Sequence, residues 1–211
     1  MHNIVKNLLD VENNIKQHLN ELKVPTFPKI IAVSKTFNID KIRPLIQYGH
    51  KDFGENKVQE AIEKWAEIKK FNSQLKLHMI GKLQTNKVKF AVKLFDYIHS
   101  VDNEKLAKKI ADEQFKENKK IKIFLQVNIG EEDQKSGIKL NALSGFMKYL
   151  RNNTNLEIKG LMCIPPVNKI PNHYFEQMQK LNIYYLHPVI SQRLLYFFQI
   201  TKYLVVLSIM V

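Results

Sequence analysis

Short apolar runs alternate along this chain with stretches whose apolar residues recur at helical spacing. The runs are residues 29–35, 51–54, 75–81, 96–101, 121–129 and 156–164. Such alternation of predicted strands and amphipathic helices is typical of a parallel sheet joined by right-handed crossovers. Because 211 residues can hold two further units of this kind, we expect an α/β fold of the (β/α)8 barrel type. A doubly wound open sheet is the structural alternative.

Polar residues gather at the carboxyl ends of these predicted strands. They are Lys35, residues 54–56, Gly81, Lys82, residues 100–102, Asn128, Pro165 and Pro166. In a parallel barrel the carboxyl ends of the strands meet at one rim, where ligands bind. The pattern therefore predicts a ligand site on that rim.

Lys35 ends the first predicted strand and shares a face with Val33 and Ile31, because side chains alternate along a strand. This places an amine at the mouth of the predicted core. Partial desolvation there favours the neutral amine, which can condense with an aldehyde such as that of pyridoxal phosphate. The alternative is a lysine that caps the strand and reaches into water.

The net charge of +13 suggests a nucleic acid partner, since basic surfaces attract phosphate backbones. Nearly all of this charge is lysine, however, and Arg43, Arg151 and Arg193 are the only arginines. Arginine is the residue favoured for bidentate recognition of phosphates and base edges. We therefore expect a mainly solvated basic surface and no specific nucleic acid partner.

Three features bear on the cellular compartment. Residues 1–22 have the apolar spacing of an amphipathic helix, whereas a signal peptide needs an unbroken apolar segment. Cys163 is the only cysteine, which excludes an internal disulfide and suits a reducing cytosol. Polar residues interrupt the apolar stretch 194–211, which is only just long enough to span a membrane. We expect a cytoplasmic protein without a membrane segment.

Five motifs then follow one another in order. They are Ala32-Val33-Ser34-Lys35, Phe-Gly-Glu-Asn-Lys-Val-Gln-Glu at 53–60, His-Met-Ile-Gly-Lys-Leu-Gln-Thr-Asn-Lys at 78–87, Val127-Asn128-Ile129 with Lys135-Ser136-Gly137, and Gly-Leu-Met-Cys-Ile-Pro-Pro at 160–166. With these motifs the chain closely resembles the pyridoxal phosphate homeostasis proteins, the single-domain relatives of the alanine racemase barrel. The resemblance implies a fold type III barrel of the alanine racemase N-terminal type.

The resemblance also implies four cofactor-binding residues. Lys35 would form a Schiff base, the internal aldimine, with pyridoxal 5'-phosphate. Asn56 would lie beside the cofactor, the segment beginning at His78 would shape the rim after the third strand, and Lys135 would lie on a loop near the site. From the residues alone, Asn56 instead caps the next helix, His78 is a core histidine and Lys135 belongs to a solvated loop. Both interpretations stay open for these three residues.

The resemblance ends before the carboxyl terminus. All seven glycines lie at or before Gly160, and no acidic residue follows Glu176. The family ends with Met-Gly-Met-Ser and Val-Arg-Ile-Gly strands that hold the cofactor phosphate, and residues 183–211 contain neither. We therefore predict a cofactor-binding barrel domain, 1–182, incomplete at its last strands, followed by a divergent apolar tail, 183–211. We expect weaker phosphate binding and unpaired strand edges as a result.

The function implied is intracellular pyridoxal phosphate homeostasis: a monomer would hold the cofactor as a lysine aldimine, without substrate turnover, and supply it to apoenzymes. A racemase-like enzyme dependent on the same cofactor is the main alternative. Racemisation needs an acid/base group on each face of the Cα carbanion, and the related racemases supply the opposing tyrosine from an extra domain that this chain is too short to contain. A non-functional or frame-shifted fragment is the second alternative.

Overall fold

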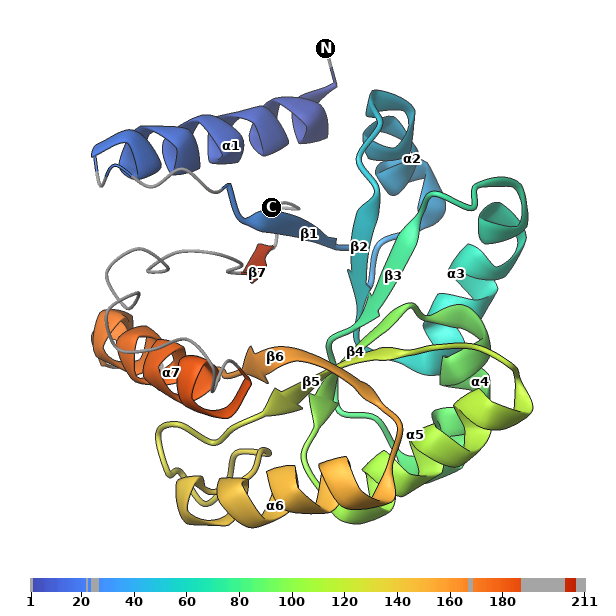
Figure 1. Cartoon of the computed structure of the whole chain (residues 1–211). Coiled ribbons are helices and arrows are strands. Elements are labelled where there is room, and N and C mark those ends of the chain that lie inside the picture. Colours follow the sequence, from blue (N-terminus) through green and yellow to red (C-terminus); the bar gives the residue numbers. More distant parts are fainter. Residues whose placement is uncertain (1, 22, 24–26, 167–168, 187–203, 208–211) are drawn as a thin grey trace. The chain divides into compact units, whose positions relative to one another are not determined.

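Strands and helices alternate along the chain in the computed structural model, which describes residues 2–21, 23, 27–166, 169–186 and 204–207, the last segment by its backbone alone (Figure 1). The elements are α1 (Asn3–Glu21), β1 (Lys29–Val33), α2 (Ile39–Tyr48), β2 (Asp52–Glu55), α3 (Val58–Phe71), β3 (Lys76–Met79), the 3-10 turn η1 (Thr85–Lys87), α4 (Val88–Leu94), β4 (Tyr97–Val101), α5 (Glu104–Lys116), β5 (Lys122–Gln126), α6 (Leu140–Asn153), β6 (Glu157–Met162), α7 (Pro171–Leu186) and β7 (Leu204–Leu207). The six predicted strands and the N-terminal helix are confirmed, although the strand ends differ from those predicted.

The described residues form two compact units. The first comprises those within 1–55, 60–77 and 190–211, and the second those within 56–59 and 78–189. Much of the predicted tail, at 187–203 and 208–211, lies outside the described residues.

In the first unit, β1 lies between β2 and β7 and runs parallel to both. Val33 of β1 is opposite Gly54 of β2. Trp65 of α3 is fully buried, and its ring centroid lies 4.8 Å from that of Phe53 in β2. β1 is therefore paired on both sides, and an aromatic contact packs α3 against β2. β7, which comes from the predicted tail, occupies the second edge of β1. The expected unpaired edges fall on β6 and β7, each of which has one neighbour among the described strands.

The second unit holds the end of β3, at His78 and Met79, together with β4, β5 and β6. These strands are parallel, and each pairs with the next along the chain. Ile98, Ile123 and Leu125 of the central strands are fully buried. Neighbour order that follows chain order is typical of a barrel wall, whereas a doubly wound sheet reverses its order at a switch point. The described residues supply seven strands, so the eighth strand of a complete barrel is not among them.

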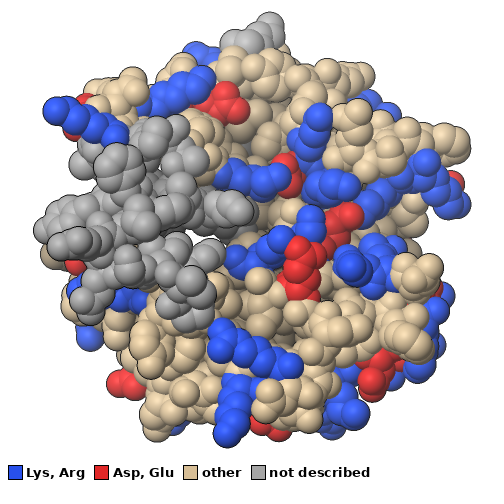
Figure 2. All heavy atoms as spheres, viewed as in Figure 1, with Lys and Arg blue, Asp and Glu red and all other residues tan. Residues whose placement is uncertain are grey.

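Lysine and arginine side chains are spread over the face shown in Figure 2, and acidic side chains lie among them. On α5, Lys109 and Lys116 pair with Glu113 at 2.9 and 3.0 Å, and these hydrogen bonds lower the pKa of its carboxyl. Such pairs are typical of a solvated helix face. Among the described helices, none has the length and hydropathy needed to cross a bilayer.

Replacing the cap residue of α5 provides a test of this fold. Asn103 Oδ1 accepts a hydrogen bond from the Leu106 N–H at 2.9 Å and satisfies one of the free donors at the helix start. Asn103→Ala should lower the free energy of unfolding by about 1 kcal/mol in urea titrations, whereas Asn103→Ser should keep most of the stability. Equal losses in both variants would contradict this account of where α5 begins.

Candidate functional site

Lys35 lies on the turn that follows β1. The Phe37 N–H donates to the Ser34 carbonyl at 3.3 Å and closes this turn. Lys35 is exposed, and its amine makes no hydrogen bond or ion pair with any described residue. The predicted desolvation of Lys35 is therefore wrong, because β1 ends at Val33, two residues before the predicted strand end, and leaves the lysine on a surface turn.

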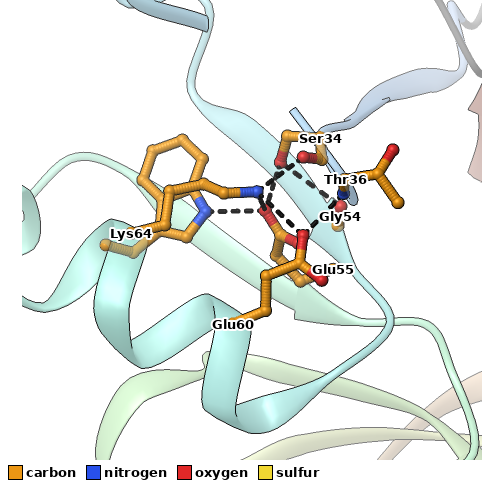
Figure 3. Close-up of polar contacts among 7 residues, drawn as sticks. Ser34, Thr36, Gly54, Glu55, Glu60 and Lys64 are labelled. Carbon is orange, nitrogen blue, oxygen red and sulfur yellow. Dashed lines mark hydrogen bonds and ion pairs between the residues drawn. The ribbon is translucent and has the colours of Figure 1, made fainter. Parts of the chain in front are cut away.

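A buried carboxylate joins this turn to β2 and α3. Glu55, at the end of β2, is fully buried, and its Oε1 accepts hydrogen bonds from Ser34 Oγ at 2.7 Å, Trp65 Nε1 at 2.8 Å and Lys64 Nζ at 2.9 Å (Figure 3). Only 7% of the Lys64 side chain is exposed. A buried charge is tolerated when it is paired and hydrogen-bonded, so these donors keep Glu55 in place.

The same group of side chains also binds the backbone on both sides of Lys35. Lys64 Nζ donates to the Ser34 carbonyl at 2.7 Å, and Glu60 Oε1 accepts the Thr36 N–H at 2.6 Å (Figure 3). The Ser34 N–H donates to the Gly54 carbonyl at 2.9 Å, continuing the pairing of β1 with β2. The backbone of the turn is thus held while the lysine side chain is left exposed.

In the second unit, Gly81 contacts both Asn56 and Ser100. A Cβ at Gly81 would lie 2.4 Å from the Asn56 carbonyl oxygen, so only glycine fits against this backbone. The Gly81 carbonyl also accepts a hydrogen bond from Ser100 Oγ of β4 at 2.7 Å. Asn56 is half-buried, and no described residue forms a hydrogen bond with its side-chain amide. The helix cap expected of Asn56 is therefore not observed among the described residues, and its contact with a cofactor stays a prediction.

His78 lies inside an aromatic cluster of the second unit. It is 1% exposed, stacks on Tyr97 at 4.4 Å between centroids, and its Nδ1 lies 3.0 Å from Nε2 of His99. His99 in turn stacks on Phe124 at 4.5 Å. His78 is thus placed as a core histidine, and a contact with a cofactor stays a prediction.

Lys135 is half-buried on the loop between β5 and α6. Its Nζ lies 2.7 Å from Glu132 Oε1 and donates to the Pro165 carbonyl at 3.2 Å. Gly137, at φ +124°, packs against the backbone of Asn128, where a side chain would clash. Lys135 therefore ties this loop to the segment after β6 and does not lie free in water.

Sequence reasoning missed the partners of two of these groups. Ser34, Lys64 and Glu55 were not recognised as a cluster, and His99 was not recognised as the partner of His78. One signal was available for Glu55: a carboxylate that continues an apolar strand requires a buried partner. Nothing in the spacing identifies that partner, since Lys64 and Ser34 are 30 residues apart.

Comparison with known proteins gives a family match and relatives that share one name. Residues 7–185 match the family described as alanine racemase, N-terminal domain. The pyridoxal phosphate homeostasis protein of Pasteurella multocida is 36% identical over 163 residues, which are 77% of this chain and 70% of that protein. The protein of the same name from Escherichia coli strain K12 is 32% identical over 167 residues, covering 78% and 71%.

Two solved structures extend this comparison. PipY of Synechococcus elongatus, in a structure with pyridoxal phosphate bound, is 32% identical, has a TM-score of 0.69 and is matched over 82% of both chains. Alanine racemase of Corynebacterium glutamicum, at 15% identity and a TM-score of 0.57, covers 75% of this chain and 45% of that one, and shows similarity of fold alone.

The buried histidine pair makes stability depend on pH. Burial, together with the neighbouring His78, holds the pKa of His99 well below its usual value. Below about pH 6.5 the unfolded chain therefore binds a proton at this residue that the folded chain does not bind, and stability falls as the pH falls.

The free energy of unfolding should decrease by at most about 1.4 kcal/mol per pH unit for this one proton. His99→Phe, which keeps a ring against Phe124, should lose that part of the slope in urea unfolding between pH 7.5 and 5.5. His18→Phe, on the exposed face of α1, should keep it. Parallel pH profiles for the parent protein and His99→Phe would contradict the prediction.

Proposed function

Because this chain belongs to the pyridoxal phosphate homeostasis protein family, we propose that it binds pyridoxal 5'-phosphate covalently through Lys35 and serves cofactor homeostasis without substrate turnover. PipY, a relative of similar fold, has been solved with pyridoxal phosphate bound. The observation that carries the proposal is the Lys35 amine: it is exposed and unpaired among the described residues, on a turn whose backbone is hydrogen-bonded on both sides.

The described residues fit the aldehyde end of this cofactor. When bound, pyridoxal phosphate supplies an aldehyde that reacts with a primary amine, and an anionic phosphate that needs hydrogen-bond donors. Lys35 provides the amine at the carboxyl end of a parallel strand, where ligands of such folds bind. Asn56 provides an unused amide directly after β2. Residues 183–211 lack the family's two phosphate-binding motifs, so we assign no phosphate ligand.

The remaining parts of the proposal concern the cell. We place the protein in the cytoplasm as a monomer that exchanges the cofactor with apoenzymes. The name shared by the relatives, pyridoxal phosphate homeostasis protein, supports the exchange of cofactor, and the single cysteine suits a reducing compartment.

Lys35→Ala should abolish covalent attachment. Borohydride reduction after incubation with pyridoxal phosphate, followed by peptide mapping, should place the pyridoxyl group on Lys35 in the parent protein and nowhere in the variant. The free energy of unfolding should change by no more than about 0.5 kcal/mol, because the side chain is exposed. Lys41→Ala, at an exposed lysine of α2, is the control and should still be labelled. A parent adduct mainly on Lys82, Lys87 or Lys135 would refute the assignment.

We also predict that the protein does not racemise amino acids. Proton removal and return on opposite faces of Cα need two free acid/base groups. Around the Lys35 turn, the Glu55, Glu60 and Lys64 side chains are engaged with one another or with backbone. Incubation of the cofactor-loaded protein with L-alanine in D2O should therefore give neither D-alanine nor deuterium at Cα. Lys35-dependent racemisation would favour the enzymatic alternative.

A further inference from the structure

Two side chains of α3, Lys64 and Glu60, form hydrogen bonds with the backbone on either side of Lys35. The proposed function assigns no role to these two residues. We propose that both are positioning residues: they hold the backbone of Ser34 and Thr36 so that the Lys35 amine is presented to pyridoxal phosphate. This inference rests on the proposed attachment of the cofactor at Lys35.

The conformation of Thr36 shows that the turn needs external support. Its φ of +65° lies in the left-handed region, which is uncommon for a residue other than glycine and is an outlier for a β-branched one. Such strained residues persist where the surrounding contacts hold them. The Thr36 N–H donates to Glu60 Oε1 at 2.6 Å, which is the contact that holds this residue.

The contacts of Lys64 go beyond neutralising a buried carboxylate. Lys64 Nζ lies 2.9 Å from Glu55 Oε1 and 3.4 Å from Glu60 Oε1, and it also donates to the Ser34 carbonyl at 2.7 Å. An ion pair with Glu55 alone would not require this third contact. Because Glu60 and Lys64 are four residues apart, they share one face of α3, and that face reaches the residues before and after Lys35 (Figure 3).

The helix supplies a rigid base for these contacts. Trp65, next to Lys64, is fully buried and donates to Glu55 Oε1, which fixes α3 against β2. The chain thus connects the reactive turn to its core through side chains that never touch the Lys35 amine. We expect a lysine whose neighbouring backbone is held in this way to react faster than one on a mobile loop, because the base of its side chain is in place before the cofactor arrives.

The test is the rate of covalent attachment, followed by absorbance after mixing with pyridoxal phosphate and confirmed by borohydride trapping on Lys35. Glu60→Ala should slow attachment about tenfold, the size expected for the loss of one hydrogen bond involving a charged group. Glu60→Gln keeps an oxygen that can accept the Thr36 N–H and should react nearly as fast as the parent. Lys64→Met should also slow attachment, and Lys70→Met, in an exposed ion pair of the same helix, is the control and should not.

Two further readouts separate positioning from a general effect on folding. The Thr36 amide should exchange with deuterium faster in Glu60→Ala than in the parent. Pyridoxine 5'-phosphate, which lacks the aldehyde, should bind parent and Glu60→Ala with the same Kd. Should Lys64→Met fail to fold, Glu60→Ala carries the test, since the Glu60 side chain is 30% exposed and the Glu55–Lys64 pair remains.

The proposal is overturned if Glu60→Ala reacts at the parent rate, if Glu60→Gln is as slow as Glu60→Ala, or if pyridoxine 5'-phosphate loses affinity by the same factor as the rate. In each of these cases the parent protein still attaches the cofactor at Lys35, and the proposed function stands. If the parent itself forms no adduct at Lys35, the proposed function fails and this inference fails with it.

Discussion

Glu55 Oε1 accepts three hydrogen bonds in the buried interior of the first unit, and the geometry of the Lys35 turn depends on them. A fully buried carboxylate raises the free energy of the folded state unless it is paired and hydrogen-bonded. Glu55 can therefore be buried at the end of β2 only because Ser34, Lys64 and Trp65 donate hydrogen bonds to it. Those residues come from the end of β1 and from α3. One buried oxygen therefore joins three elements of the unit.

The hydrogen bonds of Glu55 and Lys64 account for the conformation of the Lys35 turn better than they account for the stability of the fold. Replacing a buried ion pair by apolar side chains is often neutral or stabilising, so Glu55 and Lys64 are not explained by core packing alone. Their bonds to Ser34, and the bond from Thr36 to Glu60, fix backbone atoms on each side of an exposed lysine. The unit thus combines a rigid backbone with an accessible amine, which is the combination that covalent capture of an aldehyde requires.

Local sequence patterns predicted the helices and strands, because the spacing of apolar residues within each segment indicates which of the two it forms. They also singled out Lys35 and residues 54–56 as polar groups after apolar strands, and the binding roles of Lys35 and Asn56 stay predictions. They failed where the structure depends on distant pairs: Lys64 with Ser34, His78 with His99, and β7 with β1. The end of β1 was missed for the same reason. The Ser34 hydroxyl binds Glu55, 21 residues away, and the chain turns between Ser34 and Phe37.

The most direct test of this account is a crystal structure of the protein after exposure to pyridoxal phosphate. We predict continuous density between Lys35 Nζ and the cofactor, with Thr36 still at positive φ and its N–H still bound to Glu60. Density joining the cofactor to another lysine, or a Ser34–Thr36 turn released from Glu60 and Lys64, would contradict the account.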